Sequence, residues 1–77
     1  MRAYILVRTE PGEAGRHVSR EIRKLKGVSS AEDVTGPYDV VVEVDTSSLR
    51  ELGSEILSRL HAVPGIARTI TCPIITH

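Results

Sequence analysis

Apolar and polar positions alternate along the chain in short blocks that predict six secondary-structure elements. The clearest block spans residues 36–45 and reads Gly-Pro-Tyr-Asp-Val-Val-Val-Glu-Val-Asp. β-branched side chains pack well on a pleated sheet and lose rotamer freedom in a helix. The Gly-Pro dipeptide before the valines and the polar residues after them favour a short strand. We therefore predict a central strand with Val40, Val42 and Val44 on one face.

Three further runs have the character of strands. The first extends from Tyr4 to Val7 and is as apolar as the valine run. Residues 28–35 alternate small and acidic side chains, which is typical of an edge strand, where charge discourages unwanted pairing. Residues 66–72 form the last strand. The tail of residues 73–77 contains two isoleucines, which we expect to contact another surface such as a neighbouring subunit.

Two amphipathic helices separate these strands. The first is predicted over residues 13–26 and ends at Gly27, a common residue after a helix. The second starts at Ser48, where Ser48 and Glu51 have the spacing of a capping box, and ends before Pro64-Gly65. The apolar stripes recur every three or four residues and consist of Ala14, Val18, Ile22 and Leu25, then Leu49, Leu52, Ile56 and Leu60.

The order β-α-β-β-α-β predicts an α+β, ferredoxin-like fold. Two interleaved right-handed βαβ units give a four-stranded antiparallel sheet with both helices on one face. The first and third strands, which are the most apolar, are expected at its centre. We expect residues 1–77 to form one domain.

The other face of this sheet is predicted to be open. Tyr4, Leu6, Val41 and Ala67 are assigned to it, together with Thr69 and Thr71. Contiguous exposed apolar surface usually marks an interface. We therefore expect two sheets to pack face to face in a homodimer, a dimeric α+β barrel.

The composition favours a small cytoplasmic domain over a nucleic-acid-binding or membrane-spanning protein. The chain has 77 residues without Phe or Trp, so its core must be aliphatic. Ten basic and ten acidic residues give a formal net charge of zero, which argues against a dedicated nucleic-acid binder. The single Cys72 and the absence of a signal peptide predict a reducing, cytoplasmic location. No apolar run approaches the roughly 20 residues of a membrane span.

Few residues suggest catalysis or metal binding. His17, His61 and His77 lack metal-ligand spacing, and no Cys-x-x-Cys pair or Gly-rich phosphate loop is present. Cys72 has no basic activator nearby in the sequence. We expect a non-enzymatic protein without metal or cofactor. A small dimeric enzyme of the ferredoxin-like fold stays an alternative, but it needs a base beneath the sheet.

Two segments are candidates for recognition. In the turn of residues 36–39, Asp39 either caps backbone N–H groups or accepts a hydrogen bond from a ligand ammonium, with Tyr38 as a wall. In the last strand, the hydroxyls of Thr69 and Thr71 either reflect plain β propensity or bind a carboxylate beside backbone N–H groups.

These same segments resemble a known family. Gly36 to Val44 resembles the "Gly-x-Tyr-Asp, then apolar strand" segment in the effector domain of the Lrp/AsnC regulators. Gly65 to Thr71 is similar to the "Gly-Val-x-x-Thr-x-Thr" last strand of that domain, which is called the RAM (regulation of amino acid metabolism) module. The regulators carry an N-terminal helix-turn-helix, whereas here the first strand starts by Tyr4. The chain therefore resembles the stand-alone form.

The resemblance implies an amino-acid-binding, oligomer-forming module. It implies dimers that assemble in rings of four or five, as an octamer or decamer, with the ligand in the seams between dimers. Control of transcription or amino-acid metabolism would then act through assembly, including mixed assembly with full-length relatives, and not through direct DNA binding. A pure co-assembly partner is the alternative. The implied site residues are Gly36, Tyr38, Asp39, Thr69 and Thr71, and Arg68 and Glu55 are candidates for the side-chain pocket.

Overall fold

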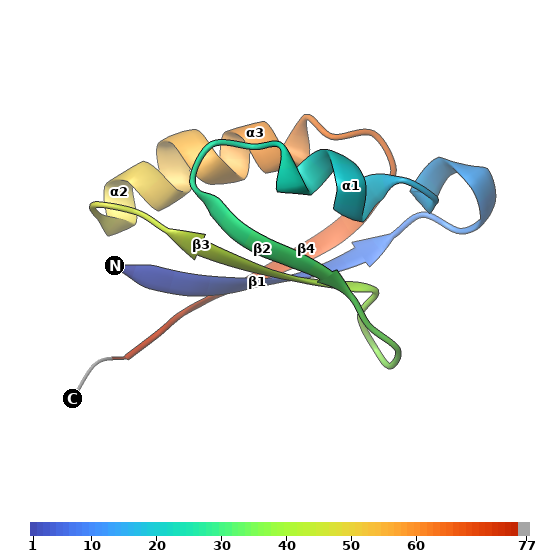
Figure 1. Cartoon of the computed structure of the whole chain (residues 1–77), viewed down its shortest axis with the longest axis horizontal. Helices are drawn as coiled ribbons and strands as arrows, with labels where there is room; N and C mark the ends of the chain where they lie inside the picture. Colours follow the sequence, from blue (N-terminus) through green and yellow to red (C-terminus); the bar gives the residue numbers. More distant parts are fainter. Residues whose placement is uncertain (76–77) are drawn as a thin grey trace.

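A computed structural model describes residues 1–75 of the chain (Figure 1). A 3-10 turn, η1 (Gly12–Gly15), precedes the first helix, α1 (Val18–Arg23). The second helix is continuous and consists of α2 (Leu49–Glu51), a π-helical turn (Leu52–Ile56) and α3 (Leu57–His61). The strands are β1 (Arg2–Thr9), β2 (Val28–Asp33), β3 (Val40–Asp45) and β4 (Ile66–Pro73).

The four strands form one antiparallel sheet in the order β2-β3-β1-β4. Both helical segments cover the same face of this sheet, and the other face is open (Figure 1). The predicted α+β, ferredoxin-like fold is therefore confirmed, with β1 and β3 at the centre and β2 at an edge. β2 ends two residues earlier than predicted, at Asp33.

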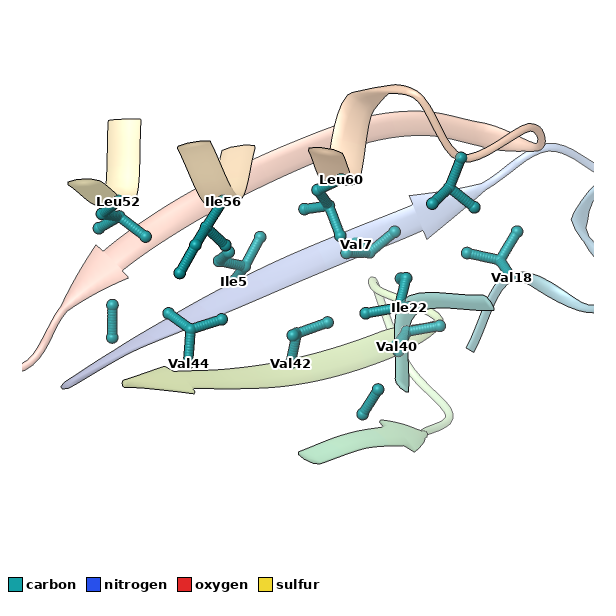
Figure 2. Packing of buried hydrophobic residues seen from close by; sticks show 13 residues of the cluster. Ile5, Val7, Val18, Ile22, Val40, Val42, Val44, Leu52, Ile56 and Leu60 are labelled. Carbon is teal, nitrogen blue, oxygen red and sulfur yellow. The ribbon is translucent and has the colours of Figure 1, made fainter. Parts of the chain in front are cut away.

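The core lies between the sheet and the helices and is aliphatic throughout (Figure 2). Ile5 pairs with Val42 across the two central strands, and both are fully buried. The helices contribute Val18 and Ile22 of the first predicted stripe and Leu52, Ile56 and Leu60 of the second to this core. The buried cluster consists of Ala3, Ile5, Val7, Val18, Ile22, Ala31, Val40, Val42, Val44, Leu52, Ile56, Leu60 and Val63.

The first helix is shorter than its periodicity predicted. Residues 12–15 form a 3-10 turn, and only Val18–Arg23 is α-helical. A Cβ atom at Gly15 would lie 2.1 Å from the carbonyl oxygen of Glu10, so the chain folds back tightly against the end of β1. This close approach interrupts the helix and leaves Ala14 exposed, so its assignment to the apolar stripe was wrong.

The second helix starts with half of the predicted capping box. Ser48 Oγ accepts a hydrogen bond from the backbone N–H of Glu51 at 3.1 Å, as a helix cap does. The Glu51 carboxylate instead accepts one from the Ser47 hydroxyl at 2.6 Å. Leu49 is 61% exposed, which contradicts its place in the buried stripe. Leu49 lies before the π-helical turn. The extra residue in that turn rotates the preceding residues around the helix axis, so Leu49 does not face the core.

Thr69 and Thr71 lie on the helix-covered side of β4, not on the open face as predicted. Thr69 pairs with buried Val7, and Thr71 pairs with buried Ile5. Directly paired residues of an antiparallel sheet share a face. The pairing shifts between Arg8 and Thr9, which leaves Ala67 as an extra residue in β4. Such a bulge inverts the side for every later residue of the strand.

The last strand continues one residue further than predicted, to Pro73. The backbone N–H of Ile74 still donates to the carbonyl oxygen of Arg2 at 3.0 Å, whereas Ile75 is 76% exposed. Thr76 and His77 lie outside the described residues, so the partner contact expected of the tail stays a prediction. Within residues 1–75, no helix has the length and apolar character needed to cross a membrane.

Candidate functional site

The turn of residues 36–39 is fastened to the end of β1. The backbone N–H of Asp39 donates to the carbonyl oxygen of Val7 at 2.8 Å, and its carbonyl oxygen accepts from the N–H of Val34 at 2.9 Å. Gly36 has φ of +125°, a backbone conformation that side chains disfavour, although no atom lies within 4 Å of where its Cβ would be. Glycine is thus required here for the shape of the turn.

The Asp39 carboxylate binds the neighbouring strand. Its Oδ2 atom accepts hydrogen bonds from the backbone N–H of Thr9 at 2.8 Å and from the Thr9 hydroxyl at 3.2 Å. This is the backbone-capping role that the sequence allowed for Asp39. One carboxylate oxygen therefore fixes the turn.

Arg8 and Tyr38 form the second contact between β1 and the turn. The Arg8 guanidinium donates to the carbonyl oxygen of Pro37 at 2.5 Å and lies 5.8 Å from the centroid of the Tyr38 ring, a cation–π distance. The sequence interpretation missed Arg8 and Thr9. Antiparallel pairing of residues 4–7 with the valine strand was the available signal, since it places residue 8 beside Asp39.

An open groove of about 520 Å³ lies where the turn, the end of β1 and the 3-10 turn meet. It brings Gly36 and Asp39 together with side chains of both charges. Arg16, one of the lining residues, is paired with Glu13 at 2.7 Å. The groove is lined by Arg8, Thr9, Glu10, Pro11, Gly12, Gly15, Arg16, Gly36, Pro37 and Asp39.

The two threonines do not reach this groove within one copy of the chain. Both are half-buried, and no lining residue of the groove comes from β4. The Thr69 hydroxyl instead lies 3.1 Å from Nε2 of His61, which is exposed on α3. The structure thus separates the five predicted site residues into a turn group and a threonine group.

The groove offers hydrogen-bonding groups and charges for binding. Two pKa shifts lie elsewhere: hydrogen bonding to Glu43 raises the pKa of Arg2, and hydrogen bonding to Lys24 lowers the pKa of Glu21. His17, like His61, is exposed. Among residues 1–75, no three His, Cys, Asp or Glu side chains gather as metal ligands would.

Comparisons with known proteins agree with this picture. The model of the family described as "Lrp/AsnC ligand binding domain" matches residues 2–76. An uncharacterized HTH-type transcriptional regulator of Pyrococcus abyssi is 31% identical over 71 residues, which cover 90% of this chain and 47% of the regulator. The chain thus spans about half the length of that relative. A homocitrate synthase of Sulfurisphaera tokodaii is 30% identical over 69 residues, which cover only 15% of the enzyme.

Solved structures share the fold over nearly the whole chain. The crystal structure of FFRP-DM1 is 32% identical and superimposes with a TM-score of 0.84, covering 96% of this chain and 97% of that one. A transcriptional regulator of Neisseria meningitidis, solved in complex with L-Met, has a TM-score of 0.85 at 18% identity. It covers 97% of this chain and 49% of its own, and it shows the fold alone.

Proposed function

Because the chain belongs to the family of Lrp/AsnC ligand-binding domains, we propose that it binds an amino acid and acts as a self-associating regulatory module. The observation that carries this proposal is the groove beside the Gly-Pro-Tyr-Asp turn, where Arg8 and Asp39 lie together. Charges of both signs suit a zwitterion. The Neisseria meningitidis regulator that shares the fold was solved with an amino acid, L-Met.

We propose a site that two copies share. The turn of one copy supplies Gly36, Tyr38 and Asp39, and β4 of another supplies Thr69 and Thr71. Gly36 lets the backbone approach the ligand, and the remaining oxygen of Asp39 accepts from the ammonium. Tyr38, which does not line the groove within one copy, forms a wall of the shared site, and the threonine hydroxyls hold the carboxylate with nearby N–H groups. Sharing the site between copies explains why the two groups lie apart within one chain.

Assembly is the proposed output of binding. Dimers form through the open sheet faces, and four or five dimers close into an octamer or decamer with the ligand in the seams. A ligand that contacts two dimers favours the assembled state by its differential affinity, typically about 1–3 kcal/mol. Transcription or amino-acid metabolism is then controlled through assembly and not through direct DNA binding. A chain with a formal net charge of zero lacks the basic excess that attracts the DNA phosphates.

Native mass spectrometry with a mixture of the amino acids tests this function. We expect an assembly of even subunit number that gains one amino-acid mass per subunit. The Asp39→Asn variant should assemble but lose the adduct. An assembly that gains no mass at millimolar ligand would contradict the binding proposal.

A second candidate is a pure co-assembly partner of full-length regulators. It is favoured by the match to only 47% of the Pyrococcus abyssi regulator, because such relatives carry the same domain beside another segment. Co-expression with a full-length relative and purification through a tag on that relative would detect mixed assemblies. Mixed assemblies without any amino-acid adduct would favour this candidate over the first.

A further inference from the structure

The open face of the sheet carries a continuous apolar strip. Leu6 on β1 pairs with Val41 on β3 and with Ile70 on β4. Tyr4 and Ile70 expose more than a third of their surface, 39% and 36%. Such a strip across three neighbouring strands needs a cover, as the proposed function assumes.

Charged residues lie beside the strip, with Glu32 on edge strand β2, Arg68 on edge strand β4 and Arg8 on central strand β1. Arg8 and Arg68 pair directly across β1 and β4, and like charges in that position repel each other. Glu32 lies on β2 and pairs with Val41 of the strip. None of the ion pairs within residues 1–75 includes Arg8, Arg68 or Glu32.

Glu32 and Arg68 lie too far apart to pair within one copy. β2 and β4 are the two edge strands, separated by three strand spacings of about 4.8 Å, or about 14 Å. Glu43, a second acid on this face, already binds Arg2 at 2.8 Å. Arg8 donates to the Pro37 carbonyl oxygen, but Arg68 has no ion pair among residues 1–75, so an acid from another chain is free to pair with it.

A second copy supplies that acid when two open faces meet. A two-fold axis between the sheets and parallel to the strands places β4 of one copy over β2 of the other. Packed sheets are about 10 Å apart. Glu32 of one copy and Arg68 of the other are also offset along the strand direction by two residues, or about 7 Å. Two long side chains extending toward each other cover this separation.

We propose that Glu32 of each copy forms an ion pair with Arg68 of the other copy. These two ion pairs fix the orientation of the dimer in which β4 of one copy lies over β2 of the other. The inference rests on the proposed self-association and adds the residues that direct it. Symmetry makes the pair occur twice in each dimer. The incoming carboxylate also offsets the repulsion between Arg8 and Arg68. A free carboxylate ligand would neutralise the arginines but leave Glu32 unpaired. A second copy of the open face pairs both the arginine and the glutamate, so it is the better partner.

Charge reversal tests the pairing. Sedimentation equilibrium at low salt would compare the wild type with Arg68→Glu, Glu32→Arg and the double variant. We expect each single variant to weaken dimerisation about tenfold or more, because it sets like charges against each other. The double variant should recover nearly wild-type affinity. Lys26→Glu, a reversal at an exposed residue outside the strands, is the matched control and should leave affinity unchanged.

The outcomes separate this inference from the function on which it rests. A wild-type dimer that ignores both single reversals, or a double variant as weak as the single ones, would overturn the pairing alone. A wild-type chain that remains monomeric at high concentration would overturn the proposed self-association and the pairing with it. Circular dichroism of each variant verifies that the subunit is folded.

Discussion

The two faces of the sheet are built from alternate residues of the same strands, yet they serve different purposes. On the helix-covered face, Ile5 and Val42 are completely buried in an aliphatic core. On the open face, their neighbours Leu6 and Val41 are half-buried, and Tyr4 is 39% exposed. One face therefore holds the subunit together, and the other is available for association. Substitutions on the two faces should differ in how their effects depend on protein concentration.

The largest effect is expected in the core. Leu60→Ala removes a fully buried side chain and should lower the free energy of unfolding by about 2–5 kcal/mol. Urea unfolding at two protein concentrations should show this loss equally at both. Ile70→Ala on the open face should instead cost more at the higher concentration, where the dimer contributes to stability. Equal losses at both concentrations for Ile70→Ala would contradict the assignment of the open face to association.

The next effect concerns the fold-back at Gly15, before the late start of the first helix. Gly15→Ala places a Cβ atom 2.1 Å from the Glu10 carbonyl oxygen, so the backbone must move. We expect a loss of about 1–3 kcal/mol in unfolding free energy.

Gly53→Ala is the matched control for that substitution. Its Cβ meets no atom within 4 Å, and alanine in a helix is favoured over glycine by about 0.5–1 kcal/mol. Thermal unfolding should therefore shift in opposite directions for the two variants. A similar shift for both would contradict the close packing of Gly15 against β1.

A smaller effect is expected at the turn that borders the groove. Asp39→Asn replaces the charged acceptor of two Thr9 hydrogen bonds and should cost about 1 kcal/mol in unfolding free energy. Asp45→Asn, at the other end of the valine strand, affects an exposed pair with the terminal amine and should cost less. Chemical denaturation of both variants gives the comparison. Equal costs would indicate that Asp39 does not hold the turn.

The smallest effect is the pH dependence of α1. Hydrogen bonding to Lys24, at 2.9 Å, lowers the pKa of Glu21 below its ordinary value. A carboxyl with a lowered folded-state pKa stabilises the fold above its unfolded pKa, and this contribution disappears as the pH falls through the folded value. The difference in urea midpoint between the wild type and Glu21→Gln should therefore be present near neutral pH and vanish in acid. A difference that grows in acid would contradict the pairing.

Local patterns predicted most of the fold. The valine run at residues 40–44 and the stripe of Leu52, Ile56 and Leu60 depend on side-chain periodicity, which the sequence records directly. The failures came from backbone irregularities that periodicity does not show, such as the π-helical turn after Leu49 and a bulge in the last strand. The bulge at Ala67 arises from pairing with β1, and it inverted the predicted side of Thr69.

The candidate site was predicted only in part for the same reason. The turn residues were recognisable from their own spacing, and the structure brings Gly36 and Asp39 to one groove. Arg8 and Thr9 carry no motif, since their role comes from the register of β1 against β3. Gly15 likewise appeared as one residue in a helical pattern, although its lack of a side chain is what the contact with Glu10 requires.

The central claim is that two copies share one amino-acid site, and mixing defective subunits tests it most directly. Asp39→Ala subunits keep intact threonines, and Thr69→Val/Thr71→Val subunits keep an intact turn. Each should fail to bind the amino acid identified with the wild type. After the two are mixed and reassembled, isothermal titration calorimetry should detect restored binding, because some seams join two intact halves. Mixed assemblies, verified by mass, that still bind nothing would contradict the shared site.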